Sequence, residues 1–161
     1  KLTSEKYNDE FYEKLVTDYS ISYRDSLKTK TLIFPEVADT LKKLKQKGTL
    51  NSIATSKNTE LAELSCKYLH IDKYFDFCIG GDYVTQGKPH PEMLLVTLNK
   101  LGVDYKDAVM IGDSTFDIEM GNAINMDTIA VTWGAHTKDQ LKQTHPTYMI
   151  DNFSEIIKFI P

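Results

Sequence analysis

The sequence lacks several features that would place it outside the ordinary globular proteins. It has no apolar run long enough to span a membrane and no signal peptide, so we expect no membrane partner. Its net charge is −4 and its lysines are spread along the chain, which predicts no nucleic-acid partner. Its two cysteines, Cys66 and Cys78, have neither metal-ligand spacing nor a disulfide framework. Together these absences favour a cytoplasmic protein.

The 161 residues that are present suffice for one domain with a sizeable core. The first residue is Lys1 rather than methionine, so we expect the chain as written to be processed, trimmed or incomplete. Residues 4–27 are charged and rich in tyrosine, and they are predicted to be helical.

From Pro35 onward, helical and strand patterns alternate along the chain. One helix is predicted after Pro35, a second begins at an N-cap of Asn58 or Thr59, and a third has Pro91 in its first turn. The predicted strands cover residues 50–55, 75–79, 108–111 and 129–132, and a closing helix is expected over 153–160. This alternation predicts an α/β domain with a parallel sheet.

The most informative stretch runs from Val109 to Asp117, where a short apolar run ends in Gly-Asp-Ser. The apolar run predicts a buried strand, and residues 116–124 can begin a helix. Asp113 then lies at the carboxyl end of a strand, where α/β proteins place ligands, and Asp117 follows one turn later on the same side. Two such carboxylates suit a hard divalent cation such as Mg²⁺. The alternative interpretation is a strand-to-helix turn capped by Asp113 or Ser114.

Further polar side chains follow other predicted strands. Thr55 and Ser56 end the strand over 50–55, and Lys88 comes after the strand over 75–79. In a parallel sheet these ends lie along one edge, where a hydroxyl could donate to a phosphoryl oxygen and an ammonium could stabilise developing negative charge. Helix-capping hydroxyls and a solvated loop lysine are the alternatives.

Three segments, in their order and spacing, closely resemble the second, third and fourth motifs of the haloacid dehalogenase-like hydrolases. They are Ala54-Thr55-Ser56-Lys57, Gly87-Lys88-Pro89-His90-Pro91-Glu92 and Ile111-Gly112-Asp113-Ser114-Thr115-Phe116-Asp117. The similarity is strongest to the phosphoglycolate phosphatase and β-phosphoglucomutase branch. It implies a Rossmann-like parallel sheet with helices on both faces over residues 31–161, and a helical cap remnant over residues 1–30.

One departure from the family is severe. The first family motif, Asp-x-Asp-x-Thr, supplies the nucleophile that forms an aspartyl-phosphate and the general acid/base, and no Asp-x-Asp occurs before Pro35. In the family this motif ends a strand that lies between the strands matching 50–55 and 108–111. We therefore expect a core that lacks its first strand. Either the sheet is split there, or the slot is filled by an N-terminal fragment, by a swapped strand or by the β-prone segment Lys30 to Phe34.

The resemblance implies a Mg²⁺-dependent phosphatase that acts on a small phosphorylated metabolite through an aspartyl-phosphate. Thr55, Ser56 and Lys88 would bind the phosphate, with Thr55 and Lys88 as catalytic groups. Asp113 and Asp117 would hold Mg²⁺, Asp117 as a weaker ligand or as the group that positions Lys88. Because the nucleophile lies outside this sequence, the chain alone is expected to be inactive.

Three other functions stay open. A phosphomutase of the same family would share these motifs, and a haloacid dehalogenase is disfavoured by Gly112-Asp113-Ser114. A non-catalytic phosphate-binding or regulatory module would follow if this chain were the whole protein. The substrate stays undefined, because in this family the cap selects it.

Overall fold

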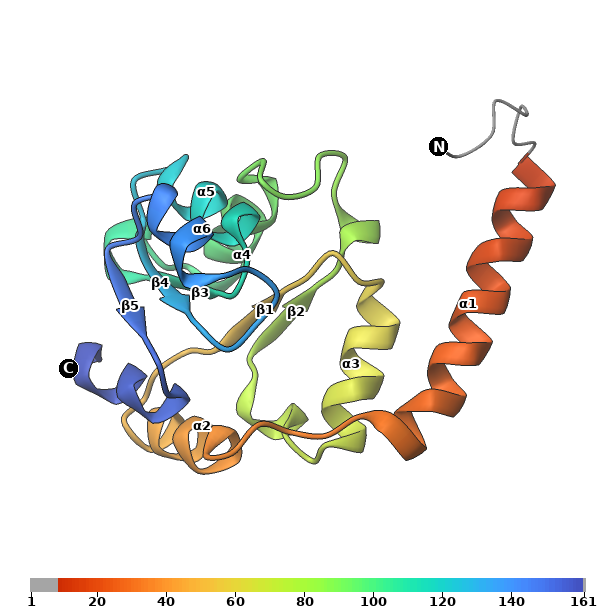
Figure 1. Ribbon diagram of the computed structural model, residues 1–161, viewed down its shortest axis with the longest axis horizontal. Helices are drawn as coiled ribbons and strands as arrows, with labels where there is room; N and C mark the ends of the chain where they lie inside the picture. The colour runs from red at the N-terminus through yellow and green to blue at the C-terminus, as the bar shows by residue number, and fades with distance from the viewer. Residues whose placement is uncertain (1–8, 161) are drawn as a thin grey trace. The chain divides into compact units, whose positions relative to one another are not determined.

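The computed structural model describes residues 9–160, and the chain falls into two compact units, residues 1–32 and 33–161 (Figure 1). In the first unit the described part is one helix, α1 (Asp9–Lys30). It agrees with the predicted helix from residue 9 onward, whereas residues 4–8 of that prediction lie outside the described residues. Among residues 9–160, no helix combines the length and the apolar character needed to cross a membrane.

The second unit alternates helices with short strands. In chain order these are α2 (Val37–Gln46), β1 (Ser52–Ala54), α3 (Thr59–Tyr68), β2 (Phe77–Ile79), α4 (Glu92–Leu101), β3 (Val109–Gly112), α5 (Thr115–Asn122), β4 (Asp127–Val131), α6 (Lys138–Gln143) and β5 (Tyr148–Ile150). Short 3₁₀ helices are η1 (Asp72–Tyr74), η2 (Gly81–Tyr83), η3 (Tyr105–Asp107) and η4 (Phe153–Phe159).

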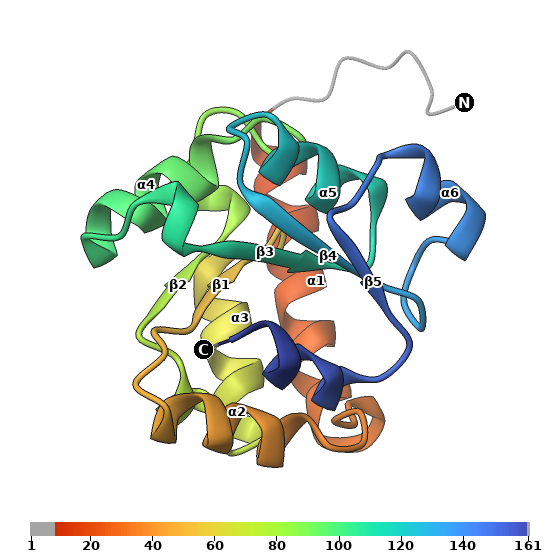
Figure 2. The same ribbon diagram turned by 90° about the vertical axis from the view of Figure 1, so that its left-hand side faces the viewer.

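All strand pairs in this unit are parallel, with helices on both faces of the sheet, as the sequence predicts. The sheet around β4 has the order β3-β4-β5, with Val109 opposite Asp127 and Ile129 opposite Tyr148. Figure 2 shows α4 and α5 on one side of these strands and α2 with η4 on the other. The α/β fold class is therefore confirmed.

Apolar side chains fill both faces. Leu41 and Leu44 of α2 pack with Ile156 of η4 and with Ile129 of β4 in one buried cluster. On the opposite face, a cluster rich in methionine joins α4, β3 and α5 (Met93, Leu94, Met110, Met120). Each large side chain buried in this way contributes about 1.5–3 kcal/mol, so the two clusters hold the helices against the strands.

Local sequence sets the helix ends. The Asn58 side chain accepts a hydrogen bond from the Glu60 N–H, so Asn58 rather than Thr59 is the N-cap of α3. Helix α4 ends at Gly102, whose φ of 66° lies in the left-handed region that favours glycine.

Several details differ from the sequence predictions. The strands are shorter than expected at 50–55 and 75–79, and the closing segment is the 3₁₀ helix η4 rather than an α-helix. Helix α6 and strand β5 were not predicted. Both are short, and α6 buries one side chain, Leu141, so apolar periodicity alone does not indicate it.

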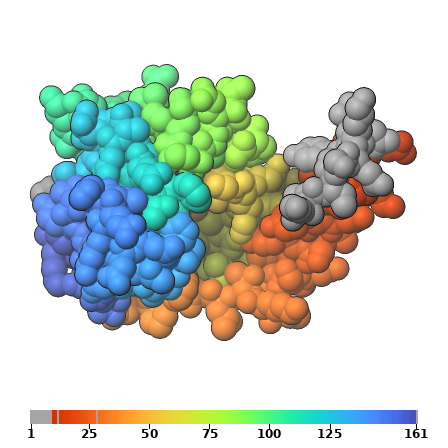
Figure 3. All heavy atoms as spheres, turned by 45° about the horizontal axis from the view of Figure 1, so that its top comes forward, coloured from red at the N-terminus to blue at the C-terminus, as the bar shows by residue number. Residues whose placement is uncertain are grey.

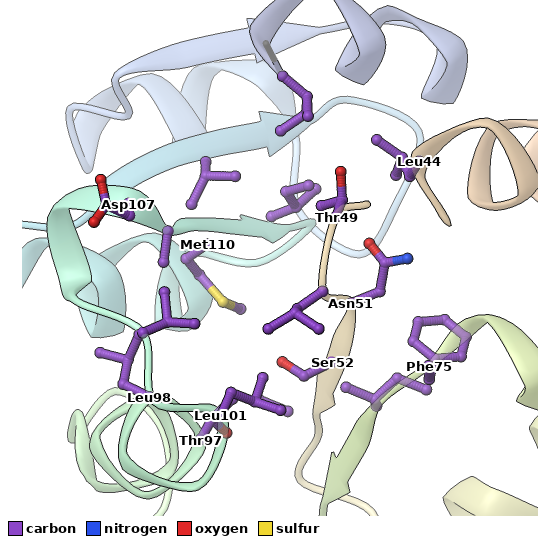
Figure 4. A pocket seen from close by; sticks show the side chains of 18 of the residues that line it. Leu44, Thr49, Asn51, Ser52, Phe75, Thr97, Leu98, Leu101, Asp107 and Met110 are labelled. Atoms are coloured by element: carbon purple, nitrogen blue, oxygen red, sulfur yellow. The ribbon is translucent and has the colours of Figure 1, made fainter. Parts of the chain in front are cut away.

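The sheet is divided in two, which confirms the expectation of a split. Strands β1 and β2 form a separate pair, with Ser52 opposite Phe77, and β1 does not pair with β3. A cavity of about 880 Å³ lies between them, bounded by α2 and α4 and lined by residues 50–54 of the β1 side and 108–111 of the β3 side. Figure 4 shows Ser52 and Met110 facing this space from the two sides, with Leu98 of α4 below. We call this cavity the strand slot.

Candidate functional site

Lys88 lies at the end of the strand slot. Its Nζ donates to the Ala54 carbonyl oxygen at the end of β1 (2.8 Å) and to Asp117 Oδ1 in the first turn of α5 (2.6 Å). The side chains of Lys88 and Asp117 are 12% and 7% exposed. A charge that is largely removed from water needs such partners, so this ion pair is a built feature rather than a solvated loop lysine.

Asp117 has both carboxylate oxygens engaged. Oδ2 accepts hydrogen bonds from the Ser114 N–H (3.1 Å) and from Ser114 Oγ (2.8 Å), which completes a capping box at the start of α5. The predicted capping role of Ser114 is thus present together with the Lys88 contact. A Cβ at Gly112 would lie 2.2 Å from the Asp117 Cβ, so only glycine allows this close approach.

Asp113 sits where β3 ends, and the loop after β4 holds its carboxylate. Asp113 Oδ2 accepts from the Ala135 N–H (2.8 Å), and its carbonyl oxygen accepts from the His136 N–H (3.1 Å). A Cβ at Gly134 would lie 2.1 Å from the Asp113 Cβ. Nothing in the local sequence around Gly134 indicates that this turn contacts Asp113.

His136 also contacts the turn after β3, and no motif in the sequence indicates this contact. Its Nδ1 accepts from the Thr115 N–H at the start of α5 (2.9 Å), and its ring lies 6.0 Å from that of Phe116. It thereby ties the loop after β4 to the turn that carries Asp113 and Asp117.

Thr55 follows β1 and offers a hydroxyl. Its N–H donates to the Ile79 carbonyl oxygen (3.0 Å), and its Oγ1 accepts from the Lys57 N–H (3.2 Å). A hydroxyl that accepts from the backbone keeps its own hydrogen for another acceptor, such as a phosphoryl oxygen. Ser56 is exposed beside it.

The candidate site therefore lies where the carboxyl ends of β1 and β3 come close to the loop that carries Lys88. In Figure 3 the segment that carries Lys88 (green) lies beside the segment that follows β3 (cyan), as their ion pair requires. Among residues 9–160, no three histidine, cysteine, aspartate or glutamate side chains form a group that could hold a metal ion. Asp113 offers one carboxylate at this edge, and a Mg²⁺ ion would need further oxygen ligands.

The two thiols stand outside this chemistry. Burial raises the pKa of the Cys66 thiol, and burial raises the pKa of the Cys78 thiol to about 11. Both therefore stay protonated near neutral pH and are poor nucleophiles.

Comparison with known proteins agrees with this geometry. The model of a family described as haloacid dehalogenase-like hydrolase matches residues 1–131. The chain therefore belongs to the haloacid dehalogenase-like hydrolases.

Within that family, the similarities point to phosphatases. A probable phosphatase, IndB, from Dickeya dadantii is 38% identical over 151 residues, covering 92% of this chain and 66% of that protein. A phosphoglycolate phosphatase from Salmonella typhimurium is 34% identical over 127 residues, covering 79% of this chain and 50% of that protein. The chain thus spans half to two thirds of the length of these two relatives.

A solved structure shares the fold. The crystal structure of a predicted phosphoglycolate phosphatase from Haemophilus somnus matches with a TM-score of 0.86 at 24% identity, covering 96% of this chain and 68% of that one. The similarity to the phosphoglycolate phosphatase branch that the motifs indicated is confirmed.

Proposed function

We propose that this chain is part of a Mg²⁺-dependent phosphatase that acts on a small phosphorylated metabolite. The observation that carries the proposal is the Lys88 ammonium, held at the end of the strand slot between the Ala54 carbonyl oxygen and Asp117. A fixed cation in a largely dry site is what phosphoryl transfer needs to stabilise its transition state. The phosphatase names of the relatives support the same reaction class.

We further propose that an extended segment from outside this sequence fills the strand slot. It would be an N-terminal segment or a strand swapped from a neighbouring molecule. Strands β1 and β3 each turn an unpaired edge toward the slot, and buried unpaired backbone groups are costly. A parallel strand buried on both faces satisfies both edges and the apolar lining. Its carboxyl end would arrive beside Lys88.

The reaction would run through an aspartate carried by that strand. Its carboxylate oxygen would form a bond to phosphorus while the bond from phosphorus to the ester oxygen breaks, and the second aspartate of the same motif would give that oxygen its proton. Water, giving a proton back to this second aspartate, would then cleave the aspartyl-phosphate to inorganic phosphate and restore the nucleophile carboxylate. Thr55 Oγ1 and the exposed Ser56 would donate hydrogen bonds to the phosphoryl oxygens. Lys88 would stabilise their growing negative charge, while Asp117 keeps its ammonium in place.

Asp113 is the residue of this chain that would hold Mg²⁺, since it follows β3 directly at the carboxyl edge of the sheet. The ion would neutralise charge on the phosphate and orient it. Asp117 has both oxygens occupied by Lys88 and Ser114, so we assign it to orienting Lys88 rather than to direct ligation. We expect the chain alone to bind Mg²⁺ weakly, because one carboxylate falls far short of octahedral oxygen ligation.

The test is to complete the sheet. The N-terminal segment of the Dickeya dadantii relative is fused ahead of this chain, and we call the product the completed protein. With Mg²⁺ it should release inorganic phosphate from small phosphate esters, and the unfused chain should not. Asp113→Asn should abolish the release, whereas Asp139→Asn, which changes an exposed carboxylate of α6, should leave it intact.

Other outcomes would redirect the proposal. Conversion of one sugar phosphate into another without phosphate release would identify a phosphomutase. Phosphate binding without turnover in a folded completed protein would favour the non-catalytic module.

The remaining expectations concern the surroundings of the protein. We propose a cytoplasmic location, supported by two free thiols, which are typical of a reducing compartment. The net charge of −4 supports a small-molecule partner rather than nucleic acid.

A further inference from the structure

The loop that carries Lys88 has few backbone hydrogen bonds of its own. Among the described residues, the N–H groups between Thr85 and Pro91 donate one hydrogen bond to another backbone group. This bond runs from the His90 N–H to the Gly87 carbonyl oxygen (3.0 Å). Yet the loop delivers a lysine side chain into a site where it is 12% exposed. Ordering a long side chain costs conformational entropy, so something must hold the loop that presents it.

Glu92 supplies that hold. Its Oε1 accepts from the Thr85 N–H (3.0 Å) and from Thr85 Oγ1 (3.0 Å), and its Oε2 accepts from the Gln86 N–H (2.8 Å). These hydrogen bonds, led by the one from Thr85, hold the pKa of Glu92 below its ordinary value. The carboxylate therefore ties the beginning of the loop to its end.

The helix that carries Glu92 is anchored in the core. Glu92 is the first residue of α4, and the next two residues, Met93 and Leu94, are buried in the methionine-rich cluster. The carboxylate does not satisfy the N–H groups of its own helix, as a simple cap would, but reaches back to the loop. Lys88 lies midway in the ring that the tie closes.

We propose that Glu92 is a positioning residue for Lys88. By closing the loop over 85–92, its carboxylate keeps the Lys88 ammonium between the Ala54 carbonyl oxygen and Asp117. The catalytic consequence rests on the proposed phosphatase function, whereas the placement of Lys88 does not.

The first test measures the placement directly. The completed protein is treated briefly with acetic anhydride, and acetylation of Lys88 is compared by mass spectrometry with that of Lys142, which is exposed and serves as the internal reference. In Glu92→Ala we expect Lys88 to react on the order of tenfold faster than in the parent, because hydrogen bonds to a charged acceptor are lost.

Further variants distinguish the loss of the Glu92 hydrogen bonds from a general loss of folded structure. Glu92→Gln keeps one acceptor oxygen, so it should give an intermediate rate, and Thr85→Val removes the hydroxyl bond alone and should give a smaller rise. Glu155→Ala is the matched control. Glu155 Oε1 likewise accepts from two consecutive backbone N–H groups, of Asp151 and Asn152 (both 3.2 Å), but it lies at η4. Unchanged Lys88 reactivity in Glu92→Ala and Glu92→Gln, or an equal rise in Glu155→Ala, would overturn the proposal.

The second test concerns turnover. In the completed protein, Glu92→Ala should lower kcat. In a Lys88→Ala background the same change should lower kcat no further, because the ammonium that Glu92 positions is already absent. Additive losses would show that Glu92 acts elsewhere and would contradict the proposal. If the completed protein has no phosphatase activity at all, the acetylation result still decides the role of Glu92, so the two failures can be told apart.

Discussion

At the scale of single residues, replacing Lys88 tests the proposed catalytic site most directly. Lys88→Ala removes the ammonium but leaves the Ser114–Asp117 capping box, so the start of α5 should persist. We expect kcat of the completed protein to fall by about 10²-fold or more, as when other preorganised electrostatic groups are removed. Phosphate release at saturating substrate measures this. Lys142→Ala, at an exposed position of α6, is the control, and an undiminished kcat in Lys88→Ala would remove Lys88 from the mechanism.

Gly134 tests how tightly Asp113 is held. A methyl group at this position would lie 2.2 Å from Asp113 Oδ2, so Gly134→Ala must displace the carboxylate. We expect the completed protein to need on the order of tenfold more Mg²⁺ for half-maximal activity, since a misplaced ligand loses affinity. Titration of activity with Mg²⁺ measures the shift. Because Asp113→Asn is expected to be inactive, Mg²⁺ binding in that background is measured by calorimetry, and Gly134→Ala should change it little there. A full additional effect would mean that the methyl group acts on something else.

At the scale of elements, the strand slot predicts a binding property of the chain by itself. A synthetic peptide matching the completing strand should bind between β1 and β3, raising the melting temperature of the chain and displacing an apolar dye from the cavity. The same peptide with a central proline should do neither, because proline cannot donate to a strand ladder. Equal stabilisation by both peptides would show that the slot does not bind an extended strand.

Some helices and strands could be predicted from the sequence and others could not. The strands around residues 52–54 and 109–112 and the division between them followed from apolar runs and from the family resemblance. Helix α6 could have been found, because Thr137-Lys138-Asp139-Gln140 fits a capping box, and the structure contains that box. Strand β5 was missed because its apolar run covers only Tyr148–Ile150, shorter than the stretches over 50–55 and 75–79 that were predicted as strands.

The site divides in the same way. Lys88, Asp113 and Asp117 stand in local motifs, so the sequence could propose them. The contacts of Gly134 and His136 join segments about twenty residues apart, and no local pattern encodes such proximity. Glu92 and Thr85 are closer to each other in sequence, but their hydrogen bond depends on the backbone conformation of the loop between them, which the composition of the loop does not specify.

At the scale of the whole molecule, several carboxylates connect stability to pH. Asp76 is one of them, because it joins α2 to the starts of β1 and β2. It is paired with Lys45, and its Oδ2 accepts from the Asn51 N–H (2.9 Å). The hydrogen bond from Lys45 leads the effects that hold the pKa of Asp76 below its ordinary value. Similar hydrogen bonds, led by those from Lys158 and Thr132 respectively, lower the pKa values of Glu155 and Asp151.

The sign of the pH effect follows from these directions. A carboxyl group whose folded pKa is depressed binds protons less readily in the folded state, so its stabilisation is complete above its unfolded pKa. That stabilisation is lost as pH falls through the folded value. We therefore expect the melting temperature of the completed protein to stay nearly level from neutral pH to about pH 5 and to fall steadily below it. Scans by circular dichroism at fixed ionic strength measure the profile.

Asp76→Asn isolates one contributor to that profile. Because the Lys45–Asp76 pair is partly exposed, its loss should lower the free energy of unfolding near pH 7 by about 0.5–1 kcal/mol. As pH falls through the lowered pKa of Asp76 and the parent carboxylate becomes protonated, the difference between variant and parent should shrink. Asp139→Asn, whose side chain is 89% exposed, should run parallel to the parent across the range. A difference between Asp76→Asn and the parent that stays constant down to pH 3 would mean that the Asp76 charge contributes nothing to the acid sensitivity of the fold.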